Sequence, residues 1–303
     1  MNARRAVVLA LALALAAVGC SSSASPPASS APACDAPTVQ RDLAYVPGGD
    51  DLQQLDLYRP PGPCRPVPLV VWVHGGGWRT GDKSHAMDDK VALWNAAGWA
   101  AASINYRLTD AGVAADQRVM APMHNEDVAA AIGWLVAQAD DLGVDPAHLA
   151  LLGHSAGASI VAALTADPSY LATRGLGPTA VTCSAPLDTE GFDIATAISG
   201  GGTQAQLFRS VFGSDPARWE DLSPRSHLGE GPVPDLFLVA RGEPDRRTAV
   251  ADFARAARDA GGTVTVVDLS GFSHADVNRR IGDPTDVDLT PALETFLTAC
   301  LDG

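Results

Sequence analysis

The sequence Leu149-Ala150-Leu151-Leu152-Gly153-His154-Ser155-Ala156-Gly157 passes from a continuous apolar run into a turn with a serine between glycines. The apolar run is typical of a strand buried on both faces, and the small residues of 156–166 favour a helix after it. Glycine at both ends of the turn allows a backbone too tight for side chains, which holds Ser155 strained and exposes its Oγ. The G-x-S-x-G pattern in this context predicts a nucleophilic serine. The alternative is an ordinary turn that contains a serine by chance.

Strands and helices alternate on both sides of this turn. Because such alternation favours a mainly parallel sheet with helices on both faces, we expect an α/β fold with eight strands. Residues 188–231 show no clear pattern, and we expect them to form a small irregular lid. The expected strands are 39–46, 53–58, 69–73, 100–106, 149–152, 180–183, 236–240 and 264–269, and the expected helices are 84–97, 125–138, 156–166, 248–260 and 291–301.

A second glycine-rich motif, His74-Gly75-Gly76-Gly77-Trp78, directly follows the expected strand 69–73. Three glycines let the backbone approach a substrate and direct N–H groups at a developing negative charge. We expect the N–H groups of Gly76, Gly77 and Ala156 to form an oxyanion hole. The alternative is a flexible glycine turn without a catalytic role.

Together, HGGGW and GHSAG in this order resemble the motifs of the α/β-hydrolase family, in its hormone-sensitive-lipase/carboxylesterase group. Residues 71–83 are similar to a subgroup that contains feruloyl and acetyl-xylan esterases and kynurenine-formamidase-like enzymes. Asn105-Tyr106-Arg107-Leu108 matches the same subgroup, and the resemblance covers about residues 39–301. It implies the α/β-hydrolase fold and a catalytic triad in the order nucleophile, acid, base.

The expected base is His274, because it follows the last expected strand, 264–269. The resemblance places the acid three residues after Gly242, at Asp245, where it would orient the imidazole. Glu243 is a competing acid, and Asp188 a more remote one. In the family a histidine usually precedes this glycine, whereas this chain has Arg241.

The N-terminus has the pattern of an export signal. Arg4 and Arg5 precede the apolar run 6–18, which is too short to span a bilayer and typical of a signal peptide over 1–19. Ala17-Val18-Gly19-Cys20 resembles a bacterial lipobox, so we expect Cys20 to be lipidated. Residues 20–33, rich in Ser, Pro and Ala, would then form a tether before a hydrolase domain at 34–303. The alternative is an ordinary signal peptide and an incidental cysteine.

The net charge of −14 argues against a nucleic-acid partner, which needs basic residues to neutralise phosphate. An acidic body would also not bind an anionic membrane, so we expect membrane contact only through a lipid anchor at Cys20. The expected location is the outer face of the bacterial cytoplasmic membrane, or outside the cell if Cys20 is not lipidated. We expect a monomer with a small-molecule ester as its partner.

Export also favours disulfides among Cys34, Cys64, Cys183 and Cys300. Three pairings are possible. The expected hairpin would bring Cys34 beside Cys64, which leaves Cys183 with Cys300. The alternative is buried free thiols. No CxxC or Cys/His cluster occurs, so we expect neither a metal nor an organic cofactor.

Three functional hypotheses remain. The first is a serine carboxylesterase that hydrolyses small or short-acyl esters through Ser155, His274 and Asp245 and an acyl-enzyme. The second is an arylformamidase-type amide hydrolase with the same triad. The third is a binding protein that uses a hydrolase fold without catalysis.

Overall fold

The computed structural model describes residues 36–62, 64–114 and 116–303. The strands are β1 (Thr38–Ala44), β2 (Gln54–Arg59), β3 (Val67–Val73), β4 (Ala100–Ile104), β5 (Val144–His154), β6 (Cys183–Leu187), β7 (Asp235–Ala240) and β8 (Val264–Asp268). The helices are α1 (Asp88–Ala96), α2 (Met123–Ala137), α3 (Ala139–Leu142), α4 (Ala156–Ala166), α5 (Ser169–Ala172), α6 (Ile194–Ser199), α7 (Gly202–Phe212), α8 (Pro216–Asp221), α9 (Pro224–His227), α10 (Pro244–Asp259), α11 (His274–Arg279) and α12 (Leu289–Leu301).

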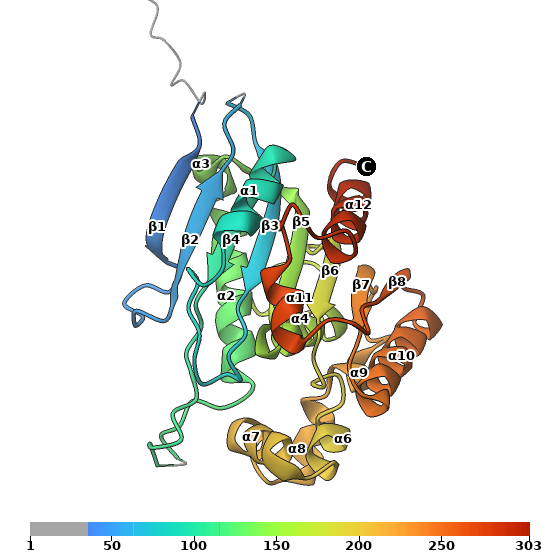
Figure 1. The fold of residues 1–303 in the computed structure, drawn as a ribbon. Helices are drawn as coiled ribbons and strands as arrows, with labels where there is room; N and C mark the ends of the chain where they lie inside the picture. Colours follow the sequence, from blue (N-terminus) through green and yellow to red (C-terminus); the bar gives the residue numbers. More distant parts are fainter. Residues whose placement is uncertain (1–35, 63, 115) are drawn as a thin grey trace, which may run out of the picture. The chain divides into compact units, whose positions relative to one another are not determined.

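All eight strands belong to one sheet, in the order β1-β2-β4-β3-β5-β6-β7-β8 (Figure 1). The strands β3 to β8 are parallel, whereas β2 pairs antiparallel with both β1 and β4. The predicted mainly parallel, eight-stranded sheet is therefore confirmed. Because the strands β3 to β8 share one direction, the loops that follow them meet at one edge of the sheet.

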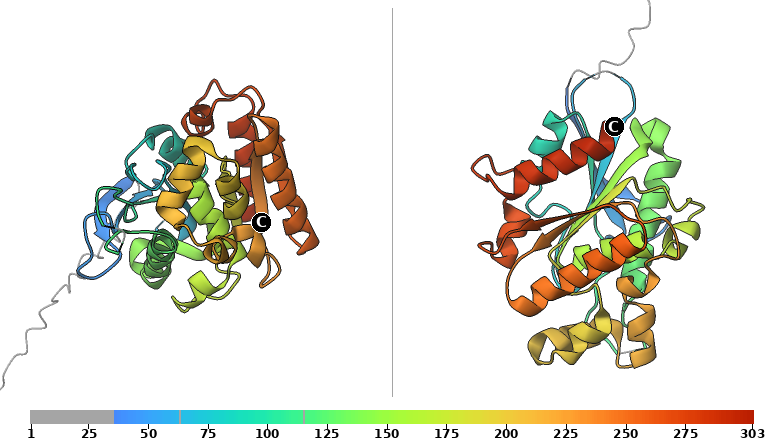
Figure 2. Two further views of the ribbon diagram at one scale, coloured as in Figure 1. Left: turned by 90° about the horizontal axis from the view of Figure 1, so that it is seen from below. Right: turned by 90° about the vertical axis from the view of Figure 1, so that its right-hand side faces the viewer.

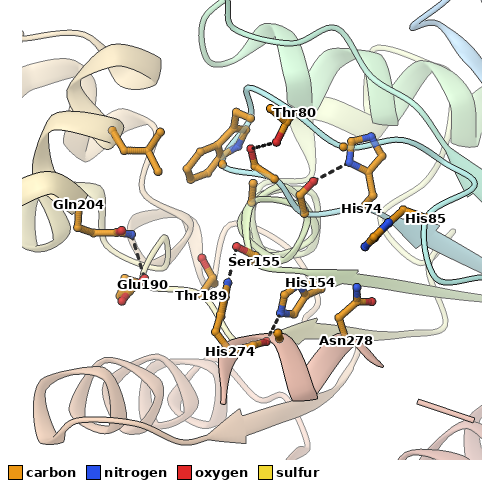
Figure 3. Close-up of a pocket in the computed structure, with 18 of the residues that line it drawn as sticks. His74, Thr80, His85, His154, Ser155, Thr189, Glu190, Gln204, His274 and Asn278 are labelled. Atoms are coloured by element: carbon orange, nitrogen blue, oxygen red, sulfur yellow. Dashed lines mark hydrogen bonds between the residues drawn. The ribbon is translucent and has the colours of Figure 1, made fainter. Parts of the chain in front are cut away.

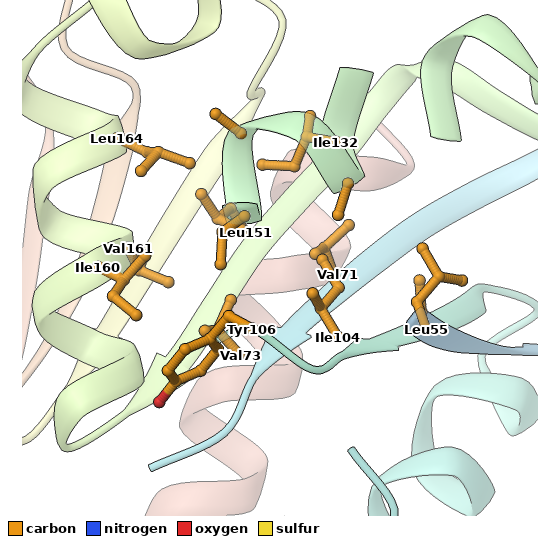
Figure 4. Packing of buried hydrophobic residues seen from close by; sticks show 14 of the residues in the cluster. Leu55, Val71, Val73, Ile104, Tyr106, Ile132, Leu151, Ile160, Val161 and Leu164 are labelled. Carbon is orange, nitrogen blue, oxygen red and sulfur yellow. The ribbon is translucent and has the colours of Figure 1, made fainter. Parts of the chain in front are cut away.

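Helices cover both faces of the sheet, with α1, α11 and α12 on one face and α2 and α4 on the other (Figures 1 and 2). The side chains of β3 alternate between these layers, as the period of a strand requires. Val71 and Val73 pack in the layer that contains Ile132 of α2 (Figure 4). Trp72 points to the opposite layer, where its ring centroid lies 6.2 Å from that of Trp94 in α1. Burial on both faces explains why β3 is continuously apolar.

Two of the elements that begin elsewhere than the sequence predicts affect the site. The strand expected at 180–183 is β6, which starts at Cys183 and runs to Leu187. All five of its residues are buried, so packing in the sheet overrides the poor strand preference of Pro186. Helix α10 starts at Pro244 rather than at 248, because proline fits the first turn of a helix. Both shifts change which side chains lie at the ends of β6 and β7.

The expected lid is more regular than predicted. Residues 194–227 form the helices α6, α7, α8 and α9, so the expectation of irregular structure is wrong for this segment. The helices α6, α7 and α8 lie beyond the carboxyl ends of the strands (Figure 1). Phe208 and Phe212 of α7 contact Trp78 edge-on, with ring centroids 5.2 and 5.3 Å apart. These contacts hold the lid against the glycine loop.

The structure also tests part of the cysteine and N-terminal predictions. Cys183 and Cys300 form a disulfide with a Cα–Cα distance of 6.2 Å, which confirms that pairing and joins β6 to α12. Cys34, the expected partner of Cys64, lies outside the described residues, as do the expected signal peptide, Cys20 and the tether. Within the described ranges, no helix is long and apolar enough to cross a membrane.

Candidate active site

Ser155 occupies a strained turn between β5 and α4. Its φ is 59° and its ψ −117°, which is rare for a residue with a side chain. A Cβ at Gly157 would lie 2.2 Å from the carbonyl oxygen of Val73, and one at Gly153 would lie 2.6 Å from that of Gly157. Gly157 is therefore required by close packing on the end of β3, and Gly153 by close packing on the first turns of α4. Ser155 lines a cleft, so its side chain is accessible, as the sequence predicts.

His274 is the first residue of α11, and its Nε2 lies 2.8 Å from Ser155 Oγ (Figure 3). A capping box fixes the start of this helix: Asp276 N–H donates to Ser273 Oγ, and Ser273 N–H donates to the Asp276 carboxylate. His154 Nε2 donates to the carbonyl oxygen of His274 at 2.9 Å. The structure thus brings the predicted nucleophile and base into hydrogen-bond contact.

The carboxylate beside His274 belongs to Asp188, whose Oδ2 lies 2.5 Å from His274 Nδ1. Asp188 comes directly after β6, has a φ of 64° and is 4% exposed. Its backbone conformation is uncommon for a residue other than glycine and is held by the surrounding contacts. The Ser155–His274–Asp188 arrangement is the geometry of a catalytic triad.

The prediction that Asp245 contacts His274 is wrong. Because α10 begins at Pro244, Asp245 lies in the first turn of that helix, where it is exposed. Glu243 is also exposed, and within the described residues neither carboxylate bonds His274. The sequence did contain a signal for Asp188, since Ser184-Ala185-Pro186-Leu187 can extend the preceding strand to the edge of the sheet.

Two arginines hold the Asp188 carboxylate. Arg241 Nε donates to Asp188 Oδ2, and Arg246 Nη2 donates to Asp188 Oδ1 at 2.7 Å. Burial by itself raises the pKa of Asp188. The hydrogen bonds from His274 and Arg241, with the charge of Arg246, outweigh burial and hold this pKa well below its usual range. Asp188 is therefore ionised whenever His274 can act as a base.

The glycine loop approaches the same serine from the other side. A Cβ on Gly75 would lie 3.0 Å from Ser155 Cβ, and one on Gly76 would lie 2.0 Å from the carbonyl oxygen of Thr80. Gly76 and Gly77 have positive φ values of 120° and 63°. Both glycines and Ala156 line the cleft that contains Ser155, as an oxyanion hole requires.

His74 braces this loop. Its ring stacks on Tyr106 with centroids 4.5 Å apart, and Tyr106 Oη donates to the His74 carbonyl oxygen at 2.9 Å. Burial lowers the pKa of His74, so the ring is neutral. His74 therefore supports the loop and does not serve as the base.

The cleft has a volume of about 970 Å³ and opens between the sheet edge and the lid (Figure 3). Trp78, Leu207 and Phe208 form its apolar side. Its polar lining comes from Ser155, His274, the two arginines and several further side chains: His85, Thr189, Glu190, Gln204, Asn278 and Arg279. The site therefore combines a nucleophile with a mixed binding surface.

Two groups of titratable side chains bring possible metal ligands close together. Ligand atoms of His154, Asp188 and His274 lie within 4.8 Å of one another, as do those of Asp167, His227 and Glu230. In the first group each side chain already takes part in a hydrogen bond of the triad or its support. These bonds suit proton transfer and orientation of the imidazole.

The sheet order, the turn at Ser155 and the glycine loop define the chain as an α/β-hydrolase. Among solved structures, esterase B from Lactobacillus rhamnosis has this fold, with a TM-score of 0.70 at 20% identity over 87% of each chain. A family model described as BD-FAE matches residues 55–175.

Two named ester hydrolases are similar to this chain in sequence. The chain is 31% identical over 247 residues to esterase LipQ of Mycobacterium tuberculosis, a match that covers 77% of this chain and 56% of LipQ. It is 29% identical to ethyl acetate hydrolase of Pseudomonas putida, covering 79% of this chain and 76% of that enzyme. These similarities agree with the resemblance to hormone-sensitive-lipase/carboxylesterase-like α/β-hydrolases that the sequence motifs carry. The chain spans little more than half the length of LipQ.

Proposed function

We propose that the chain is a serine carboxylesterase with Ser155 as nucleophile, His274 as base and Asp188 as acid. The observation that supports this proposal most is the continuous hydrogen-bonded line from Ser155 Oγ through His274 to Asp188 Oδ2, with distances of 2.8 and 2.5 Å. The named esterases among its relatives support the same chemistry. A complete triad also speaks against a hydrolase fold used only for binding.

In the proposed mechanism, His274 Nε2 takes the proton from Ser155 Oγ as the oxygen attacks the ester carbonyl. The resulting oxyanion accepts hydrogen bonds from the N–H groups of Gly76, Gly77 and Ala156. Imidazolium then protonates the leaving alcohol, which leaves an acyl-serine. Water, activated by the same histidine, attacks the acyl group and releases the acid. Asp188 stabilises the imidazolium in both halves of the reaction.

The apolar side of the cleft supports a preference for small or short acyl groups. Leu207 of α7 packs against the glycine loop: its Cδ2 lies 3.2 Å from the position that a Cβ on Gly77 would occupy. Trp78 is 3% exposed and fixed between Phe208 and Phe212. These packed side chains bound the cleft beside the oxyanion hole and favour a short acyl chain on this side.

The test is hydrolysis of p-nitrophenyl acetate and butyrate by the wild type, Ser155→Ala and the exposed control Ser169→Ala. We expect Ser155→Ala to lose at least about a thousandfold in kcat, because no other group replaces the nucleophile. Ser169→Ala should match the wild type. A fluorophosphonate should label wild-type protein at Ser155. Hydrolysis that survives in Ser155→Ala, or an unlabelled wild type, would contradict the proposal.

For the N-terminus we propose export with residues 1–19 as a signal peptide and lipidation of Cys20. The basic, apolar and Gly19-Cys20 sequence supports this assignment. The tether 20–33 would then place an acidic, monomeric hydrolase domain near the outer face of the cytoplasmic membrane.

A further inference from the structure

A chain of polar contacts connects the lid helix α7 with Asp188. Gln204 Nε2 donates to Glu190 Oε2 at 3.1 Å (Figure 3). The other oxygen of Glu190 forms an ion pair with Arg246 Nη1, and Arg246 Nη2 donates to Asp188 Oδ1 at 2.7 Å. Arg246 thus divides its guanidinium between two carboxylates that are two residues apart.

This chain of contacts borders the substrate cleft. Glu190, Arg246 and Gln204 all line it, beside the triad. Gln204 belongs to α7, the helix that also contributes Leu207 and Phe208 to the apolar side. An acyl group that contacts α7 therefore touches the helix whose Gln204 donates a hydrogen bond to Glu190.

The charges around His274 come from several elements. Asp188 and Glu190 supply two negative charges, and Arg241 and Arg246 supply two positive ones. Glu190 therefore balances the second arginine, and its loss leaves a positive charge beside the imidazole. The groups that face His274 or its immediate neighbours are Asp188 after β6, Arg241 after β7, Arg246 in α10, His154 at the end of β5 and, behind His154, Lys90 in α1.

We propose that Glu190 is a positioning residue. It keeps the Arg246 guanidinium bonded to both Glu190 and Asp188, balances the charge of Arg246 beside the triad, and links α7 to Asp188. The proposal rests on the proposed function, since it assigns a role around the same triad. Without Glu190, Arg246 turns its whole guanidinium to Asp188 and competes with His274 for that carboxylate. Protonated His274 is then less stabilised, which slows the step in which imidazolium forms.

The test measures kcat and KM for p-nitrophenyl acetate across pH in Glu190→Gln and Arg246→Gln. For Glu190→Gln we expect kcat to fall about two- to tenfold with little change in KM, as for a coupled neighbour. The acid limb of the pH profile should move down by about 0.2–0.5 units, because unbalanced positive charge disfavours imidazolium. Arg246→Gln removes that charge, so its acid limb should move up.

A double variant tests whether Glu190 acts through Arg246. In the Arg246→Gln background, Glu190→Gln should change kcat by less than about twofold. Gln204→Ala, an exposed change on the lid, should lower kcat by about twofold and add nothing to Glu190→Gln. Glu294→Gln, an exposed charge-matched change on α12, should behave as the wild type.

The results separate this proposal from the proposed function. If Ser155→Ala remains active in the same assay, both proposals fail. If Ser155→Ala is inactive but the acid limbs of the two charge variants move together, or not at all, the role of Glu190 is overturned alone. Additive losses in the double variant overturn it too. If Glu190→Gln does not fold, an acid limb of Arg246→Gln that does not move up, or a kcat of Gln204→Ala equal to that of the wild type, overturns the role of Glu190.

Discussion

Asp188 and Asp245 follow neighbouring strands, but only Asp188 contacts His274. We expect Asp188→Asn to lower kcat by about a thousand- to ten-thousand-fold, because an amide no longer stabilises the imidazolium or the required tautomer. Asp245→Asn should stay within about twofold of the wild type. Steady-state kinetics on p-nitrophenyl acetate compares the two. A large loss of kcat in Asp245→Asn with a small one in Asp188→Asn would instead identify Asp245 as the acid, as the family resemblance implies.

Lys90 is a buried residue that the triad does not use. It is 1% exposed, and its Nζ donates to the carbonyl oxygens of Ala86 and Asn278, at 2.8 and 2.7 Å. Burial lowers its pKa to about 7, whereas an unfolded lysine stays protonated to about pH 10.4. Above pH 7 the unfolded chain therefore binds one more proton than the folded chain. The free energy of unfolding should rise with pH in this window.

We expect the unfolding free energy of the wild type, minus that of Lys90→Met, to grow between pH 7 and 9. The growth should be at most about 1.4 kcal/mol per pH unit. Urea unfolding at several pH values measures it. Lys83→Met is the matched control, because Lys83 Nζ contacts Asp42 and Asp56 at 2.7 Å and its pKa is raised. If the difference in unfolding free energy from the wild type depends on pH in the same way for both variants, folded Lys90 keeps its proton.

At the scale of elements, helix α7 limits the acyl side of the cleft. Leu207 lies against the glycine loop, so Leu207→Ala opens space beside the oxyanion hole. We expect the ratio of kcat/KM for p-nitrophenyl octanoate over acetate to rise at least about tenfold, since roughly two buried methylenes gain room. Leu228→Ala, outside the cleft, is the control. An unchanged ratio would place the acyl group elsewhere.

Elements also explain how far the sequence predicts the site. The serine and histidine of the proposed triad follow from local patterns: glycines that permit the turn at Ser155, and a loop after the last strand for His274. The acid depends on where β6 ends and α10 begins, and both boundaries are decided by burial in the finished sheet. Pro186 disfavours a strand locally, yet it is buried within β6. Of the arginines that hold Asp188, Arg241 directly follows β7 and Arg246 lies in α10, so sequence spacing gives no sign of their contact.

At the scale of the whole molecule, the net charge bears on how the protein could attach to a membrane. A net charge of −14 repels anionic lipid, so the proposed attachment to a membrane rests on a covalent acyl chain rather than on the protein surface. Expressed in a bacterium with lipoprotein processing, the full chain should pellet with membranes. Detergent should release it, whereas about 1 M salt, which screens charges, should not.

The matched variants are Cys20→Ala and Ser21→Ala. Cys20→Ala removes the only sulfur that the lipobox offers, so the protein should appear in the soluble exported fraction and lose labelling by radioactive palmitate. Ser21→Ala should stay in the pellet and keep its label. Because a single acyl chain binds membranes only marginally while two or more bind stably, complete pelleting of the wild type also indicates multiple acylation. If Cys20→Ala remains in the membrane pellet, the anchor is not at Cys20.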